Sequence, residues 1–124
     1  MVRKYDPEID FESIQQWGKA WGADYQKDLF PPLGYIYPGV AAYFIYETPS
    51  RVCWLENMVS NPEVPKEVRD LALQGVVTEV LREVNRLGYK VAYATTDNQS
   101  VIDRAVKHNA TAKEGQTYLR LAFK

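Results

Sequence analysis

The stretch from residue 52 to residue 110 constrains the fold of this chain more than any other part. An apolar run at 52–59 is followed by two proline-containing helix-start signals and one long amphipathic pattern. A second apolar run at 90–95 and a shorter amphipathic stretch at 99–108 complete it. The order predicts strand, long helix, strand and short helix. Such a strand–helix–strand unit joins two parallel strands through a right-handed crossover.

The long helix is predicted from an apolar stripe that repeats every three or four residues. The stripe comprises Leu73, Val77, Val80, Val84 and Leu87, and the opposite side carries Glu79, Arg82, Glu83 and Arg86. Gly88 suits the left-handed position that often follows a helix. The apolar content of 90–95 predicts a central, well-buried strand.

The N-terminal half predicts a short strand at 2–5 and a helix that begins at Phe11, with Asp10 as its N-cap. Its apolar stripe comprises Phe11, Ile14, Trp17 and Trp21. Residues 25–33, which contain Pro31-Pro32, predict an irregular loop.

Three strands are predicted next, at 34–37, 40–46 and 51–59, and the last two form an antiparallel hairpin. A further strand at 117–123 closes the sheet. Regular alternation along 51–59 predicts two faces. One face carries Val52, Trp54, Glu56 and Met58, and the other carries Cys53, Leu55, Asn57 and Val59.

Composition limits the classes of function. The chain has 124 residues, enough for one domain, and its net charge of −1 argues against a strong grip on nucleic acid or anionic lipid. Its one cysteine cannot form an internal disulfide, which favours a reducing compartment. Neither a signal peptide nor a membrane-spanning stretch is seen, so a cytoplasmic protein is expected. With one histidine and one cysteine, a metal site is not expected.

Nine tyrosines are unusual for this length, and five of them fall between residues 25 and 46. Tyrosine suits both half-buried strands and binding surfaces. Sheet packing is one interpretation. The other is a tyrosine-rich strand pair exposed at the surface, which would offer an interface for a homodimer.

The order of elements resembles the GNAT superfamily, whose members transfer acyl groups from acyl-CoA to amines. The resemblance covers nearly the whole chain and is closest in style to GNAT-like proteins of bacteria and phages. It implies an α/β fold over residues 1–124, with a mixed, mostly antiparallel central sheet, one splayed pair of parallel strands and flanking helices. It also implies acetyl-CoA or another acyl-CoA as cofactor. The amine acceptor, a small molecule or a protein, cannot be predicted.

Three positions carry this resemblance into a site. Glu56 matches a strand carboxylate that acts as general base; alternatively, it is a carboxylate that faces solvent or pairs with an arginine. The backbone at Met58 and Val59 matches the contacts to pantetheine. Asn98 matches an asparagine near the cofactor thiol, and equally suits a turn and N-cap with Asp97.

The phosphate loop departs from the family pattern. Its glutamine or arginine position falls on Val68, and its two glycine positions fall on Leu71 and Leu73. Lys66 and Arg69 could supply charge instead, which makes the segment 66–73, Asp70 included, the candidate phosphate site. The other interpretation is a solvated helix start.

The general acid also differs from the family pattern, because Ala105 stands where the family often has a tyrosine that protonates the leaving thiolate. Tyr93 and Tyr118 are possible substitutes. The Gly-Phe pair that usually ends the last helix is replaced by Asn109-Ala110. The resemblance also implies an acceptor wall built from the first helix and the following loop, with Trp21, Tyr25, Phe30 and Tyr37, although these aromatic residues also suit a core.

Two functions therefore stand open. One is an acyl-CoA-binding N-acetyltransferase. The other is a catalytically inactive GNAT-fold protein that binds or supports a partner, favoured by the missing glycines and the missing tyrosine. A nucleic-acid adaptor is weakly supported, because no basic stripe is seen.

Overall fold

The computed structural model describes residues 1–96, 98–108, 110–117 and 119–123. The chain divides into two compact units, Met1–Tyr93 and Ala94–Lys124. A single domain over the whole chain stays a prediction.

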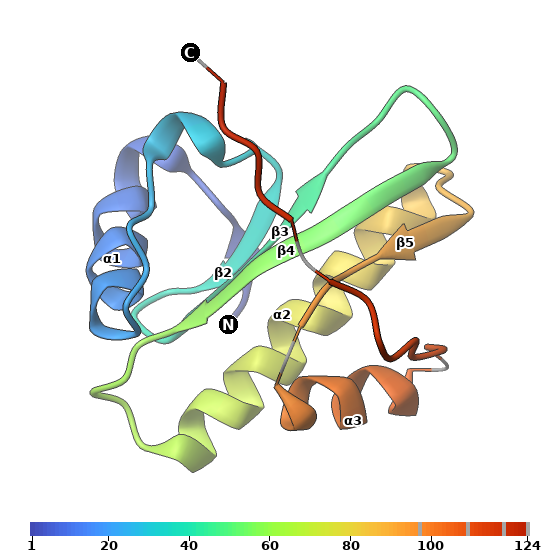
Figure 1. The fold of residues 1–124 in the computed structure, drawn as a ribbon. Helices are drawn as coiled ribbons and strands as arrows, with labels where there is room; N and C mark the ends of the chain where they lie inside the picture. The colour runs from blue at the N-terminus through green and yellow to red at the C-terminus, as the bar shows by residue number, and fades with distance from the viewer. Residues whose placement is uncertain (97, 109, 118, 124) are drawn as a thin grey trace. The chain divides into compact units, whose positions relative to one another are not determined.

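The first unit is a five-stranded sheet with two helices (Figure 1). The strands lie in the order β1-β2-β3-β4-β5; β4 and β5 are parallel and the other neighbours are antiparallel. This confirms the predicted mixed, mostly antiparallel sheet. The elements are β1 (Arg3–Lys4), α1 (Pro7–Ala20), the 3-10 helix η1 (Lys27–Leu29), β2 (Gly34–Tyr37), β3 (Ala41–Tyr46), β4 (Val52–Ser60), α2 (Lys66–Arg86) and β5 (Val91–Tyr93).

The helices α1 and α2 cover opposite faces of the sheet, so the unit has two main cores (Figure 1). Alternate residues of the central strands enter alternate cores. The α2-side core contains Tyr35, Tyr43, Ile45, Cys53, Leu55, Val76, Val77, Val80 and Val84. The α1-side core contains Tyr5, Ile14, Trp17, Ile36, Ala42, Phe44 and Val59.

The tyrosines of the strand pair belong mainly to these cores. Tyr35 and Tyr43 are buried, and Tyr37 and Tyr46 are half-buried. Sheet packing is therefore confirmed for Tyr35 and Tyr43. The alternative, an exposed tyrosine-rich strand pair, is wrong for the exposure of these two residues, and a homodimer stays a prediction.

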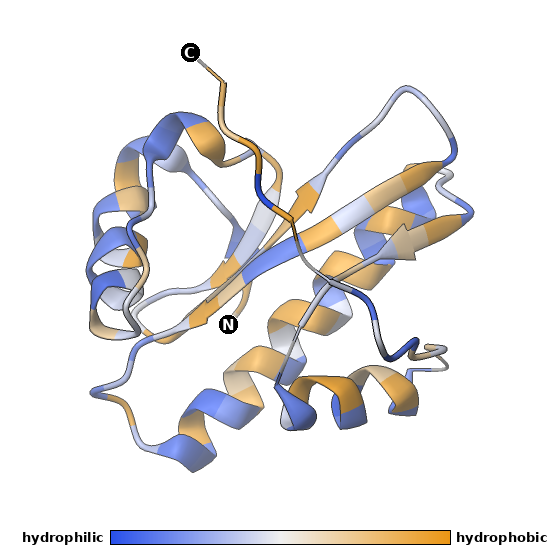
Figure 2. Cartoon of the chain, viewed as in Figure 1, coloured by the Kyte–Doolittle hydropathy of each residue, from blue (hydrophilic) through white to orange (hydrophobic). Residues whose placement is uncertain are grey.

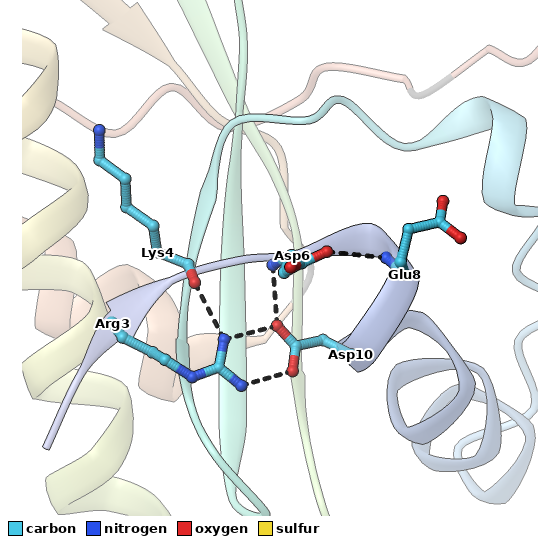
Figure 3. A network of polar contacts seen from close by, with 5 residues as sticks. All are labelled: Arg3, Lys4, Asp6, Glu8 and Asp10. Carbon is cyan, nitrogen blue, oxygen red and sulfur yellow. Dashed lines mark hydrogen bonds and ion pairs between the residues drawn. The ribbon is translucent and has the colours of Figure 1, made fainter.

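Helix α1 starts four residues earlier than predicted. Asp6 is the N-cap, and its carboxylate accepts a hydrogen bond from the backbone N–H of Glu8 at 3.0 Å. Pro7 occupies the first helical position, where its missing N–H costs nothing. The predicted cap, Asp10, is instead buried inside the first turn. It is held by Arg3, through bonds of 2.7 and 2.8 Å, and by the backbone N–H of Asp6 at 2.8 Å (Figure 3).

The apolar stripe of α2 is largely as predicted and is visible in Figure 2, since Val77, Val80 and Val84 are buried. Leu87, at its end, is 39% exposed. The prediction that Glu83 lies on the polar, exposed side of the helix is wrong, because this residue is only 5% exposed. A buried carboxylate is tolerated here because Arg86 donates two bonds to it, of 2.6 and 2.8 Å.

Strand β5 is shorter and more exposed than predicted. Val91 is 42% exposed and Tyr93 is 50% exposed. The prediction of a central, buried strand is wrong, because within the described residues β5 stands at the end of the strand order and pairs with β4 alone.

The second unit contains α3 (Gln99–Lys107), with Asn98 as its N-cap. The Asn98 side chain accepts a hydrogen bond from the N–H of Ser100 at 2.9 Å. The predicted closing strand is wrong for residues 117 and 119–123, which form no strand. Asp97, Asn109 and Tyr118 lie outside the described residues.

Among the helices of the described ranges, none combines the length and apolar character that crossing a bilayer requires.

Candidate functional site

A β-bulge interrupts the middle of β4. Glu56 pairs with Phe44, whereas Val59 pairs with Ala42, so β4 has one more residue than β3 between these pairs. Asn57 has a φ of 61°, in the left-handed region that asparagine tolerates better than most residues. Asn57 and Met58 thus both lie opposite Tyr43, as two residues do in a bulge.

The bulge reverses the side-chain alternation of β4. Before it, Cys53 and Leu55 enter the α2-side core. After it, Val59 enters the α1-side core and Met58 packs against the α2-side core. The predicted unbroken alternation from 52 to 59 is therefore wrong beyond Glu56, because one inserted residue exchanges the two faces. A polar Asn in a strand that is otherwise mostly apolar was the sequence signal for this bulge.

Pairing between β4 and β5 covers only the first part of β4. Its three pairs are Val52 with Val91, Cys53 with Ala92 and Trp54 with Tyr93. Strand β4 continues to Ser60, and in the described residues the ladder pairs of 55–60 are to β3. The backbone of Met58 and Val59 thus belongs to the part of β4 that β5 does not pair with.

Glu56 lies directly before the bulge and is half-buried. Its pairing with Phe44 places it on the α1 side of the sheet. Burial raises the pKa of Tyr43 above its ordinary value, and the negative charge of Glu56 adds to that rise. The carboxylate is therefore close enough to the bulge to act electrostatically on the residue opposite it.

A hydrogen-bond chain links the bulge to the segment that follows α1. Asn57 donates from Nδ2 to the Tyr46 hydroxyl at 2.6 Å, and that hydroxyl donates to the carbonyl of Leu29 at 3.1 Å. The bulge residue is thereby fixed by a side chain of β3 and by the 3-10 helix η1.

The segment between β4 and α2 is also fixed by hydrogen bonds. The N–H of Asn61 donates to the carbonyl of Val40 at 2.8 Å, and its Nδ2 donates to that of Gly39 at 3.1 Å. The Asn61 side-chain oxygen accepts from the N–H of Glu63 at 3.0 Å. The chain then enters α2 at Lys66.

The predicted phosphate segment falls inside this helix rather than in a loop. The N–H groups of Val68 and Arg69 both donate to the carbonyl of Pro65, at 3.0 Å each. Lys66 donates to Asp70 at 2.8 Å. Two apolar members of the segment face solvent, since Val68 is 44% and Leu71 is 71% exposed, and Leu73 is half-buried.

Trp21 connects the end of β4 with the start of α2. Trp21, at the end of α1, donates from Nε1 to the carbonyl of Ser60 at 2.7 Å. The guanidinium carbon of Arg69 lies 5.6 Å from the centre of the Trp21 ring, within range of a cation–π contact.

The predicted acceptor wall is brought together only in part. Tyr25 and Phe30 touch, with ring centres 5.0 Å apart, and Phe30 also meets Phe44 at 4.9 Å. Trp21 contacts Ser60 and Arg69 instead, and Tyr37 packs against the α2-side core. Sequence reasoning missed a surface hollow of about 260 Å³, lined by Pro31, Pro32, Leu33, Ile45, Tyr46 and Glu47.

The two remaining site predictions lie on β5 and before α3. Tyr93, the candidate acid, stacks at a tilt on Trp54, with ring centres 5.1 Å apart. Asn98 caps α3, as one of its two interpretations predicted. Tyr118 is outside the described residues. The roles of Tyr93 and Asn98 toward a cofactor stay predictions.

No protein-family model and no curated protein matches this sequence. Solved structures do match its fold. An acetyltransferase of Trypanosoma brucei has a TM-score of 0.69 at 14% identity, over 98% of this chain and 99% of its own. An aminoglycoside acetyltransferase from an uncultured soil metagenomic sample, in complex with sisomicin, scores 0.69 at 10% identity, over 100% and 96%. A GNAT-family acetyltransferase of Streptococcus pneumoniae scores 0.67 at 11% identity, over 97% of each chain. The chain therefore has a GNAT-like fold, as the sequence predicted.

Proposed function

We propose that this protein binds an acyl-CoA, acetyl-CoA in the simplest case, and transfers the acyl group to an amine. The observation that carries the proposal is the bulge at Asn57, which joins Glu56 to a stretch of β4 without β5 pairing. A fold alone does not determine an activity, so the argument rests on these residues.

Pantetheine is an extended chain with two amides, and such a chain binds well along a strand by backbone hydrogen bonds. The part of β4 that holds Met58 and Val59 can accept it, because its ladder pairs among the described residues are to β3. Backbone recognition requires no particular side chain. This role is therefore compatible with the apolar residues found there.

The phosphates of CoA need cationic or N–H donors, and the start of α2 follows β4 by only a few residues. Arg69 and Lys66 carry positive charge on its first turn. These side chains would take the place of the glycine-rich loop, whose counterpart here reads Val68, Leu71 and Leu73.

Glu56 would act as the general base. The amine nitrogen attacks the thioester carbonyl carbon, the carbon–sulfur bond breaks, and the proton lost by nitrogen passes to Glu56 directly or through water. The leaving thiolate takes up a proton, for which Tyr93 is the candidate donor. The carboxylate suits this role because it is half-buried beside the bulge.

An inactive GNAT-fold protein is the second candidate. The exposed Leu71 and Val68 favour it, because apolar side chains facing solvent at a helix start are unusual in a phosphate site. In this alternative the protein has the same fold but does not bind acyl-CoA.

Thermal unfolding with and without acetyl-CoA separates the two candidates, because a ligand that binds only the folded state raises the melting temperature. We expect a rise at millimolar acetyl-CoA, and heat of binding by calorimetry. A protein that shows neither is not an acyl-CoA-dependent enzyme.

Once an acceptor is found, Glu56→Gln should lower turnover and leave acetyl-CoA affinity unchanged. The matched control is Glu12→Gln, which alters an exposed carboxylate on α1. Equal turnover of the two variants would remove Glu56 from the mechanism.

A further inference from the structure

The two basic side chains at the start of α2 are in different states. Lys66 is paired with Asp70 at 2.8 Å. The Arg69 side chain forms no ion pair with a described residue, and its Nε is buried without an acceptor. A buried unpaired donor costs about 1–3 kcal/mol, and a free cation of this kind in a folded protein calls for an explanation.

One other buried side-chain polar atom in the described residues has no hydrogen-bond partner, the hydroxyl of Tyr5. That hydroxyl belongs to the α1-side core, where Tyr5 meets Phe44 edge to face at 4.9 Å. Burial raises the pKa of Tyr5 to about 12, so it stays neutral. Arg69 differs because it carries charge and lies at the start of a helix.

Trp21 fixes the position of Arg69. Its indole is 55% exposed, yet it is not free to turn, because Nε1 donates to the Ser60 carbonyl at 2.7 Å. The guanidinium lies over this ring. An indole pinned to the end of β4 thus holds a cation of α2 close to where β4 ends.

We propose that Trp21 is a positioning residue, which holds the Arg69 guanidinium for the phosphate oxygens of CoA. The inference rests on the proposed function and specifies which side chains replace the glycine-rich loop. It also assigns Trp21 a role at the cofactor phosphates instead of the predicted role in the acceptor wall.

The chemistry favours a phosphate over a carboxylate or a neutral group. The guanidinium is planar by conjugation, and its contact with the Trp21 ring limits its rotation, so its remaining N–H donors suit two oxygens of one phosphate.

The test is a double-mutant cycle on ligand affinity, measured by calorimetry with acetyl-CoA and with acetyl-pantetheine, which lacks the nucleotide phosphates. The variants are Trp21→Ala, Arg69→Ala and the double variant. Arg82→Ala is the matched control, since Arg82 is an exposed arginine of α2 paired with Glu79.

We expect Arg69→Ala to weaken acetyl-CoA binding about tenfold or more, the range of a hydrogen bond to a charged group. Trp21→Ala should weaken it about fivefold, and the double variant no more than Arg69→Ala alone, because Trp21 acts through Arg69. Acetyl-pantetheine affinity should not change in any variant. Trp21→Phe, which keeps a ring and loses Nε1, should fall between wild type and Trp21→Ala.

Additive losses in the double variant, or equal losses for acetyl-pantetheine, would overturn the positioning role. If the wild-type protein does not bind acetyl-CoA, the proposed function fails, and inorganic pyrophosphate then tests the inference by itself. Pyrophosphate binding that depends on both Arg69 and Trp21 would keep it, and binding that depends on neither, or no binding, would end it.

Discussion

The two ends of α1 each hold an arginine from another part of the chain, in contrasting ways. At the start, Arg3 of β1 donates to both carboxylate oxygens of the buried Asp10 and to the carbonyl of Lys4 (Figure 3). At the end, the Arg69 guanidinium of α2 lies over the face of Trp21, and its Nε has no acceptor among the described residues.

This contrast separates a structural charge from a charge that we propose binds a ligand. Arg3 neutralises a carboxylate that has lost its water, so the pair holds β1 against α1. Arg69 forms no ion pair with a described residue and lies against an aromatic ring. Each arginine therefore predicts a different response to mutation, one in stability and one in binding.

Removing Arg3 should have the largest effect on stability. Arg3→Met leaves the Asp10 carboxylate buried, with the N–H of Asp6 as its remaining partner, and should lower the free energy of unfolding by about 3 kcal/mol. Chemical denaturation measures this. Lys4→Met is the control, because Lys4 is mostly exposed and reaches Glu83 only at 3.9 Å. A loss under about 1 kcal/mol for Arg3→Met would show that the pair is not structural.

Position 57, in the β4 bulge, should tolerate only residues that adopt a positive φ. Asn57→Val places a β-branched residue at a φ of 61° and should cost about 2 kcal/mol. Asn57→Gly loses the same bond to Tyr46 but fits this φ, so it should cost about 1 kcal/mol or less. Similar losses for both variants would mean that the backbone at Asn57 is not the cause.

Acid should weaken the Arg3 end of α1 rather than its Trp21 end. Burial alone would raise the pKa of Asp10, but its bonds from Arg3 and from the N–H of Asp6 outweigh burial and hold that pKa below its ordinary value. A carboxyl with a lower pKa in the folded state stabilises the fold above its unfolded pKa of about 3.9, and loses this contribution as pH falls through the folded pKa. The free energy of unfolding, measured by denaturation at a series of pH values, should therefore fall less steeply with decreasing pH for Asp10→Asn than for wild type. Identical slopes would contradict the assignment.

Truncation at the other end should have the smallest effect on stability. Arg69→Ala removes an unpaired donor but also its contact with the Trp21 ring, and because these effects oppose each other the free energy of unfolding should change by less than about 1 kcal/mol. Arg82→Ala serves again as control. A loss as large as that of Arg3→Met would make Arg69 structural and would remove the contrast.

Regular periodicity explains which parts of the fold were predictable. The strand at 34–37 matches β2, and the long helix was found from its stripe and from Gly88, which has the predicted positive φ of 87°. These features depend on local pattern alone.

The errors arise where one residue changes its role through a distant contact. Asp10 suits an N-cap, but it binds Arg3, and Asp6-Pro7 starts the helix instead. Glu83 is buried because Arg86 neutralises it. The roles predicted for Glu56 and for the backbone of Met58 and Val59 stay predictions, and the bulge between them was not predicted. The contact between Trp21 and Arg69 was not, because it joins helices far apart in sequence.

The most direct test of the account is backbone amide hydrogen exchange with and without acetyl-CoA. If the end of β4 and the start of α2 bind the cofactor, exchange should slow at residues 57–70 and stay unchanged at 3–10, where Arg3 and Asp10 are already paired. Unchanged exchange at 57–70 under saturating acetyl-CoA, or equal slowing in both segments, would contradict it.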